Sequence, residues 1–184
     1  MILIMGLPGA GKSVQSQLIQ ERLGLHWLST GELFRNTDDV DIKATMARGE
    51  LVSDEQTSRM VGDHLKEIGY DQTFLLDGFP RTVSQARWLV EHADEIGKHI
   101  RLVLFLTVSE EVAAERLSER GRKDDSEAAR IKRNQEAQKV QPTLEYLKSQ
   151  GIEVVEIDAN SDIETIFRSI AEEVRARVPD ANQG

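Results

Sequence analysis

Short apolar runs alternate along the chain with longer stretches in which apolar residues recur every three or four positions. The runs at residues 2–5, 73–76 and 100–108 are almost continuously apolar. This pattern is typical of strands in a parallel sheet, which are buried on both faces. Two further β-rich runs, at 26–28 and 152–157, complete a set of five candidate strands.

The stretches between these runs have the periodicity of helices that are apolar on one face. Predicted helices cover residues 12–23, 83–96, 110–120, 126–149 and 162–178. A capping-box sequence from Ser53 to Gln56 predicts one more helix, which we expect to end at Gly69. Pro142 predicts a kink or an interruption in the helix at 126–149, because proline lacks the amide hydrogen that a helix interior uses.

The regular alternation of strands and helices predicts an open, doubly wound α/β sheet. Two segments depart from this alternation and are predicted insertions. Residues 30–69 are mostly helical in pattern and separate the second strand from the third, and residues 120–125, RGRKDD, form a charged turn between two helices. Both insertions should lie at the carboxyl edge of the sheet, where ligands of such folds bind.

Composition places the chain among single-domain proteins with an ordinary core. Its 184 residues are 39% apolar and 30% charged, and 23 basic against 32 acidic residues give a formal net charge of −9. This charge argues against nucleic acid or an anionic membrane surface as a partner, while a phosphorylated small molecule stays compatible with it. The chain has no cysteine, no run long enough to cross a bilayer and no signal-peptide pattern, so we expect a cytoplasmic protein.

The first candidate site is the segment GLPGAGKS at residues 6–13, directly after the first predicted strand. Its spacing, Gly6 followed by Gly11-Lys12-Ser13, is that of a phosphate-binding loop whose backbone N–H groups surround an anion. Lys12 can reach the outer phosphates of a nucleotide, and the Ser13 hydroxyl is placed near its magnesium. The loop alone leaves open whether the nucleotide serves as a switch, a fuel or a phosphoryl donor. A GTPase switch is disfavoured, because N-K-x-D is absent and the only D-x-x-G ends a helix at 94–97.

A second candidate site follows the third strand, in the sequence LLDGFPR. Asp77 is either a Walker B carboxylate that binds Mg²⁺ or an aspartate that merely ends the strand. Gly78 permits a close backbone approach, and Arg81 presents a planar, permanently charged fork to a phosphate. Arg35 lies about one turn into the segment after the second strand, so two arginines from adjacent strands are predicted to clamp one anion.

Basic residues gather between Arg116 and Arg133, which hold seven of the 23 in the chain. One interpretation is a solvated helix face, with nearby acidic residues as ion-pair partners. The other is a cationic cover over a phosphate site, because Arg116 and Arg120 are one helical turn apart, as are Arg130 and Arg133.

Five segments, GLPGAGKS, STGELFR, GELVSDE, LLDGFPRTVSQA and GRKDD, stand in the order in which adenylate kinases carry them. From residue 1 to about 170 the chain resembles a nucleoside monophosphate kinase of that family. The resemblance implies a single domain over 1–184: a P-loop NTPase core with a five-stranded parallel sheet flanked by helices. It also implies a helical NMP-binding insert at about 30–59 and a short lid at about 120–125. We expect residues 179–184 to form a flexible tail.

The resemblance also implies three groups of site residues. The ATP site would contain Gly9, Ala10, Gly11, Lys12, Ser13, Val14, Arg116 and Arg120. The AMP site would contain Thr30, Gly31, Arg35, Glu50, Leu51, Val52, Gly78, Phe79, Pro80, Arg81, Gln85, Arg122 and Arg133. Phosphoryl transfer would use Lys12, Arg81, Arg120, Arg122 and Arg133, with Mg²⁺ near Ser13 and Asp77.

Two of these residues favour AMP over UMP or CMP. Family members with threonine at the Thr30 position use AMP, whereas pyrimidine monophosphate kinases tend to carry alanine there. Gln85 offers an amide donor and an acceptor to the adenine edge. The resemblance thus implies the reversible reaction ATP + AMP = 2 ADP. A kinase of the same fold with UMP, CMP or another small acceptor is the first alternative, and an ATP-binding sensor or assembly protein without transfer is the second.

The sequence departs from the family pattern in three places. A single glycine separates Arg120 from Arg122 where long-lid members carry a β-subdomain, sometimes with four zinc cysteines, so we expect no zinc. The segment between Arg35 and Gly49 is shorter than usual, and Ser13-Val14 replaces the common Gly-Thr or Ser-Thr. We expect a monomer that binds only small nucleotides.

Overall fold

The computed structural model describes residues 1–47, 52–68, 73–119 and 127–178. Its centre is a sheet of five strands, all parallel, in the order β2-β3-β1-β4-β5. The strands are β1 (Ile2–Gly6), β2 (His26–Ser29), β3 (Phe74–Asp77), β4 (Leu102–Thr107) and β5 (Val154–Asp158). The predicted five-stranded parallel α/β sheet is therefore confirmed, with strand ends that differ from the predicted ones by one or two residues.

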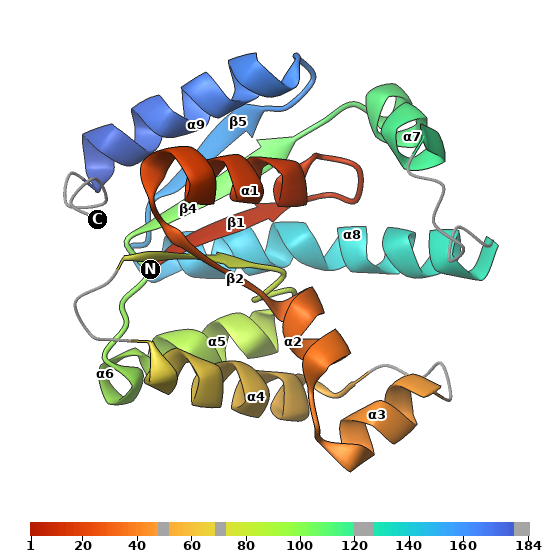
Figure 1. Ribbon diagram of the computed structural model, residues 1–184, viewed down its shortest axis with the longest axis vertical. Helices are drawn as coiled ribbons and strands as arrows, with labels where there is room; N and C mark the ends of the chain where they lie inside the picture. Colours follow the sequence, from red (N-terminus) through yellow and green to blue (C-terminus); the bar gives the residue numbers. More distant parts are fainter. Residues whose placement is uncertain (48–51, 69–72, 120–126, 179–184) are drawn as a thin grey trace.

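Helices cover both faces of the sheet because successive strand residues point to opposite sides. Ile2 and Ile4 of β1 face α1 (Lys12–Leu23) and α9 (Ile163–Arg177), whereas Leu3 and Met5 face α4 (Asp54–Glu67), α5 (Val83–Glu91) and α8 (Glu127–Ser149). Figure 1 shows α1 and α9 together on one side of the sheet and α4 with α5 on the other. The nearly continuous apolar strands predicted from sequence are those buried by these two layers.

The inserted segment between β2 and β3 is helical, as predicted. It contains α2 (Thr30–Asn36), α3 (Val40–Ala47) and α4. Ser53 and Gln56 form the predicted capping box: Ser53 Oγ accepts from Gln56 N, and the Gln56 side chain accepts from Ser53 N. This cap fixes where α4 begins and thus where the chain returns from the insertion toward the sheet.

One predicted helix is divided in the structure, and one predicted interruption is absent. The helix predicted at 83–96 divides at His92, where the backbone has φ of −101° and ψ of 6°, into α5 and α6 (Ala93–Ile96). Pro142 does not interrupt α8. Thr143 Oγ1 donates to Lys139 O at 2.7 Å, and the leucines that follow the proline, Leu144 and Leu147, are buried against the sheet and hold the helix in place.

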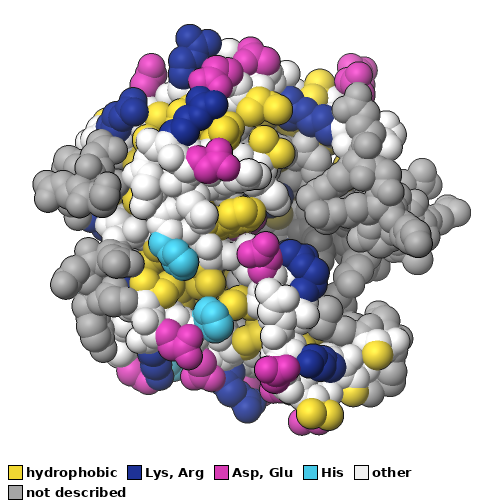
Figure 2. Space-filling model, in the orientation of Figure 1, with side chains coloured by type: hydrophobic (Ala, Val, Ile, Leu, Met, Phe, Trp, Pro, Cys, Tyr) yellow, Lys and Arg dark blue, Asp and Glu magenta, His cyan; other side chains and the backbone are white. Residues whose placement is uncertain are grey.

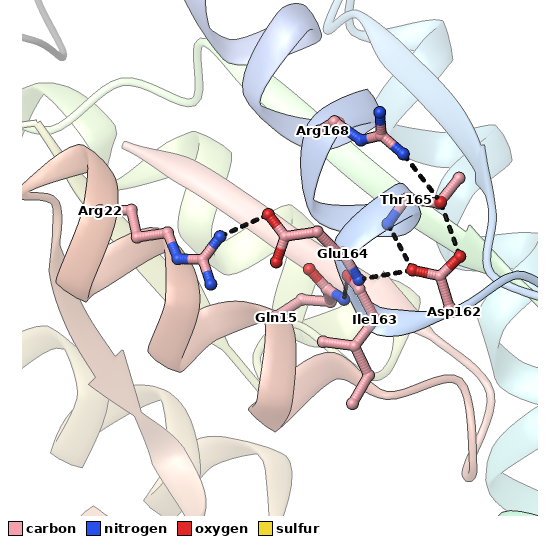
Figure 3. Close-up of polar contacts among 7 residues, drawn as sticks. All are labelled: Gln15, Arg22, Asp162, Ile163, Glu164, Thr165 and Arg168. Carbon is pink, nitrogen blue, oxygen red and sulfur yellow. Dashed lines mark hydrogen bonds and ion pairs between the residues drawn. The ribbon is translucent and has the colours of Figure 1, made fainter.

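Polar contacts join α9 to α1, the helix that follows the phosphate loop (Figure 3). Gln15 Nε2 donates to Ile163 O at 2.9 Å, and Arg22 pairs with Glu164 at 2.6 Å. Asp162 caps α9 by accepting from Glu164 N and Thr165 N. Hydrogen bonds from the side chain and backbone of Thr165 lower the pKa of Asp162. The start of α9 is therefore bonded to both ends of α1, through Gln15 near its start and Arg22 in its last turn.

Charged side chains of both signs are interspersed over the face shown in Figure 2, with small apolar areas between them. Helix α7 (Glu110–Glu119) completes the described helices, and none of these is long and apolar enough to cross a membrane.

Two isoleucines of α9 allow a matched test of the core. Ile170 is completely buried among the residues that face α1, whereas Ile163 is 54% exposed. We expect Ile170→Ala to lower the free energy of unfolding by about 2–5 kcal/mol, because it leaves a cavity in a packed layer. Ile163→Ala should change it by less than about 0.5 kcal/mol. Urea unfolding of both variants measures the difference, and equal losses would contradict this packing of α9.

Candidate active site

The phosphate loop lies between the end of β1 and the start of α1. Gly9 and Gly11 have φ of 87° and 86°, in the left-handed region that glycine adopts without strain. Lys12 Nζ donates to Gly6 O at 2.8 Å and to Leu7 O at 3.1 Å, so its ammonium lies against the loop carbonyls. The loop thus has the form that the sequence predicts, with a cation beside a turn whose amides can surround an anion.

The phosphate loop packs closely against α7. A Cβ built on Gly9 would lie 2.8 Å from Ala113 O. The loop backbone therefore lies so close to α7 that position 9 has room only for glycine. The side chains of Ser13 and Val14 are exposed at the first turn of α1. The Ser13 hydroxyl is therefore accessible to a ligand in the loop.

Asp77 ends β3 beside the strand that leads into the phosphate loop. It pairs in register with Ile4 of β1 on one side and with Ser29 of β2 on the other. Its side chain is buried, with 6% exposed. An acidic residue at this point is one strand away from the loop, which fits the Walker B interpretation. The described residues include no group of three or more histidine, aspartate or glutamate residues that could hold a metal ion by themselves.

The predicted acceptor residues come together at the ends of β2 and β3. Thr30 Oγ1 donates to Asp77 O at 3.0 Å, and Arg81 Nε donates to Gly78 O at 2.8 Å. Gly78 has φ of 86°, and a Cβ there would lie 2.3 Å from Thr30 Oγ1 and 3.3 Å from Arg81 Nη2. Thr30, Gly78 and Arg81 therefore form one compact cluster, which only glycine at position 78 permits.

Arg35 belongs to the same edge of the sheet. It lies in α2, whose cap Ser29 ends β2, and it points back along that helix. A Cβ on Gly31 would lie 3.4 Å from Arg35 Nη1, and Glu32 is 4.0 Å from Arg35 Nη2. The guanidinium is exposed, as is that of Arg81. The structure thus carries two exposed arginines on segments that follow adjacent strands.

Gln85, the predicted reader of the acceptor base, is engaged at both ends of its amide. Its Oε1 accepts from Arg81 N at 2.7 Å, and its Nε2 donates to Asp54 Oδ1 at 2.7 Å. The other carboxylate oxygen of Asp54 accepts from Thr82 Oγ1 at 2.6 Å. Sequence reasoning missed Asp54, because its only local signal is an acidic residue in the first turn of α4, where helices commonly have one.

Four more predicted site residues, Arg116, Phe79, Pro80 and Val52, lie in the part of the chain that the structure describes. Arg116 Nη1 donates to Ala159 O at 2.8 Å and Nη2 to Ser161 O at 3.0 Å, which fixes its guanidinium at the loop after β5. Phe79 is buried in edge-to-face contact with Trp88, Pro80 is buried, and Val52 is half-buried. Phe79 and Pro80 are therefore packing residues of the turn that carries Arg81.

Several predicted site residues lie outside the description. These are Glu50, Leu51, Arg120 and Arg122, together with the lid at 120–125 and the tail at 179–184. The backbone of Arg133 belongs to α8, but its side chain is not described. The predicted roles of these residues, and the proposed limits of the lid and the insert, stay predictions.

This arrangement is that of a P-loop phosphotransferase, because a protein that only binds one nucleotide needs no second set of cationic groups beside its phosphate loop. A family model for adenylate kinase matches residues 4–152, and the chain belongs to the adenylate kinase family. It is similar to the adenylate kinase of Prochlorococcus marinus strain MIT 9301, with 38% identity over 94% of this chain and 97% of that protein. It is also 37% identical to the adenylate kinase of Mycobacterium tuberculosis, over 90% and 94% of the two chains. The family resemblance noted from the motifs is confirmed.

A pair of glycines tests the close approach at the acceptor cluster. Gly78 and Gly151 both have positive φ, of 86° and 76°, but a Cβ on Gly151 would meet nothing within 4 Å. Each Gly→Ala change should cost about 1–2 kcal/mol for the backbone conformation. We expect Gly78→Ala to cost a further 1–3 kcal/mol, roughly, from overlap with Thr30.

The overlap can be isolated with a double variant. Thr30→Ala removes the Oγ1 atom that the new methyl group would meet, so the double variant Gly78→Ala/Thr30→Ala should be more stable than the sum of the two single losses predicts. Urea unfolding gives all four values. Strict additivity would show that Thr30 and Gly78 are not in the contact described.

Proposed function

We propose that this chain catalyses the reversible, Mg²⁺-dependent transfer of a phosphoryl group from ATP to AMP, which yields two ADP. The observation that carries this proposal is the cluster of Thr30, Gly78 and Arg81 at the ends of two strands beside the phosphate loop. Membership of the adenylate kinase family supports the same reaction. A protein that only senses ATP has no use for this second cluster.

The donor nucleotide would bind to the phosphate loop. The backbone amides from Gly9 to Val14 would surround its phosphates, and Lys12 would turn from the loop carbonyls toward them. Arg116, held on the loop after β5, would face the donor base. The hydrogen bonds to Ala159 and Ser161 keep its guanidinium in place for stacking.

The residues present fit a magnesium ion that comes with the nucleotide. Magnesium in such sites takes one or two carboxylates, phosphate oxygens and several waters rather than a complete protein cage. The exposed Ser13 hydroxyl and the carboxylate of Asp77 offer that partial set. When bound, Mg²⁺ supplies charge neutralisation to the phosphates.

The acceptor would bind at the strand ends. Arg35 and Arg81 would hold the monophosphate, with the backbone of Gly31 and the turn at Gly78, Phe79 and Pro80 around it. Thr30 and Gln85 would select the base, with Val52, Leu51 and Glu50 as its wall. The alternative acceptors, UMP, CMP or another small metabolite, have no specific observation in their favour.

The chemical step needs no general base, because the attacking phosphate oxygen of AMP is already ionised. The main barrier is the approach of two anions: at about 6 Å and an effective dielectric of about 20, two unit charges repel by roughly 3 kcal/mol. Lys12 and Arg81, with Arg120, Arg122 and Arg133 of the proposed lid, would offset this repulsion. Closure of the lid and the insert would exclude water, which is the competing acceptor.

We further propose a monomer that works in the cytoplasm on free nucleotides, without zinc. The formal charge of −9 disfavours nucleic acid and anionic membranes as partners, and the absence of cysteine from the sequence fits a reducing compartment.

An acceptor panel tests the proposed reaction directly. With ATP as donor, AMP should give the highest kcat/KM among AMP, GMP, CMP and UMP, because Thr30 and Gln85 match adenine. A coupled assay for ADP formation measures all four. A preference for CMP or UMP would establish the alternative kinase, and no ADP from any acceptor would establish a binding protein.

Variants of the two cationic groups should separate donor from acceptor. Lys12→Met should lower kcat by orders of magnitude with the fold intact, because Lys12 serves the transferred group. Arg81→Ala should raise the KM for AMP by about tenfold or more, the value of a lost charged hydrogen bond, and leave ATP binding near normal. Arg87→Ala is the matched control, since Arg87 lies over Tyr146, 5.2 Å from the ring centre, outside the proposed site. Equal effects of Arg81→Ala on the two nucleotides would contradict the acceptor assignment.

A further inference from the structure

Asp54, Thr82 and Gln85 form a hydrogen-bonded ring between the first turns of α4 and α5. Asp54 Oδ1 accepts from Gln85 Nε2 at 2.7 Å, and Asp54 Oδ2 accepts from Thr82 Oγ1 at 2.6 Å. The ring closes where Gln85 N donates to Thr82 Oγ1 at 3.2 Å. Outside the ring, Arg81 N donates to Gln85 Oε1 at 2.7 Å. Asp54 thus joins the first turn of α4, in the insert, to the segment that carries Arg81 and Gln85.

Every donor and acceptor in this network has a fixed role. The hydroxyl of Thr82 accepts from a backbone N–H and must therefore direct its own hydrogen to Asp54. A carboxylate only accepts, so it requires the Nε2 end of the Gln85 amide, and a backbone N–H only donates, so Arg81 N requires the Oε1 end. The two ends of the amide are therefore assigned by their partners, and rotating the amide by half a turn would break both contacts.

Amide orientation decides which purine edge a glutamine can pair with. Adenine presents a donor at N6 beside an acceptor at N1, whereas hypoxanthine presents an acceptor at O6 beside a donor at N1. A freely turning amide can match either edge, because it exchanges donor and acceptor when it flips. An amide held in one orientation matches only one of them and leaves polar groups unpaired with the other.

We propose that Asp54 is a positioning residue that locks the Gln85 amide in one orientation and so makes the acceptor site select a 6-aminopurine over a 6-oxopurine. The proposal rests on the proposed function, because it deepens the choice of acceptor at the same site. Gln85 is only 5% exposed, so water offers little replacement for either of its two fixed partners. Each end of the amide can form one more hydrogen bond: Nε2 has a second hydrogen, and Oε1 has a second lone pair. These are the groups that would pair with the base.

The test compares AMP with IMP as acceptors, since the two differ only at C6 and N1 of the base. Asp54→Asn keeps the size of the side chain but lets position 54 present either a donor or an acceptor to Gln85. We expect the ratio of kcat/KM for AMP to that for IMP to fall by about tenfold, the discrimination that one paired edge provides. The KM for AMP should rise, and the KM for ATP should not change.

Glu55→Gln is the matched control. It removes the same charge from the next residue of the same first turn, where the side chain is exposed. Its AMP-to-IMP ratio should equal that of the unchanged protein. A loss of stability alone would lower the two kcat/KM values together and leave their ratio unchanged, so the ratio separates selection from folding.

A second variant asks whether Asp54 acts through Gln85. In a Gln85→Ala background the ratio should already be reduced, and adding Asp54→Asn should reduce it no further. An AMP-to-IMP ratio that Asp54→Asn leaves unchanged overturns the proposal. So does a result in which Asp54→Asn lowers the ratio as much in the Gln85→Ala background as in the unchanged protein. If the unchanged protein forms no ADP with AMP, the proposed function fails and this inference falls with it; normal ADP formation with an unaltered ratio in the variant rejects only the inference.

Discussion

The pairing of β1 with β3 on one side and β4 on the other is the interaction on which the rest of the structure depends. Ile4 is in register with Asp77, and Gly6 with Leu106, so the strand that leads into the phosphate loop stands between two other strand ends. Parallel strands end at one edge, and the segments that follow them must therefore meet there. The phosphate loop, the turn at Gly78 and the start of α2 lie together for this reason alone.

This edge gathers positive charge from segments that are distant in the sequence. Lys12 follows β1, Arg35 follows β2, Arg81 follows β3, and Arg116 lies in the helix that follows β4. The formal charge of the whole chain is −9, so these cations are a local exception in an acidic protein. Backbone carbonyls at the strand ends accept hydrogen bonds from three of them: Lys12 and Arg81 bond within their own turns, and Arg116 bonds to the loop after β5. These hydrogen bonds fix where the three cationic groups lie at this edge.

The fold and the backbone form of the phosphate loop could be predicted because their signals are local. A continuous apolar run, a glycine loop and a capping box each depend on neighbouring residues, and the structure confirms all three. Predictions failed where tertiary contacts decide. Pro142 stays within α8 because leucines beyond it are buried against the sheet. The bonds from Asp54 to Thr82 and Gln85 span 28 and 31 residues, and no pattern within α4 indicates them.

The network around Asp54 also shows how the insert and the acceptor site depend on each other. The capping box at Ser53 sets the first turn of α4, and that turn places Asp54 against α5. The same carboxylate therefore anchors a helix of the insert and orients an amide at the predicted base site. A buried polar network of this kind stabilises one arrangement strongly only when all its members are satisfied. Each donor in this ring meets an acceptor, so the bonds that orient the Gln85 amide also join the first turn of α4 to α5, in addition to the core packing of α4.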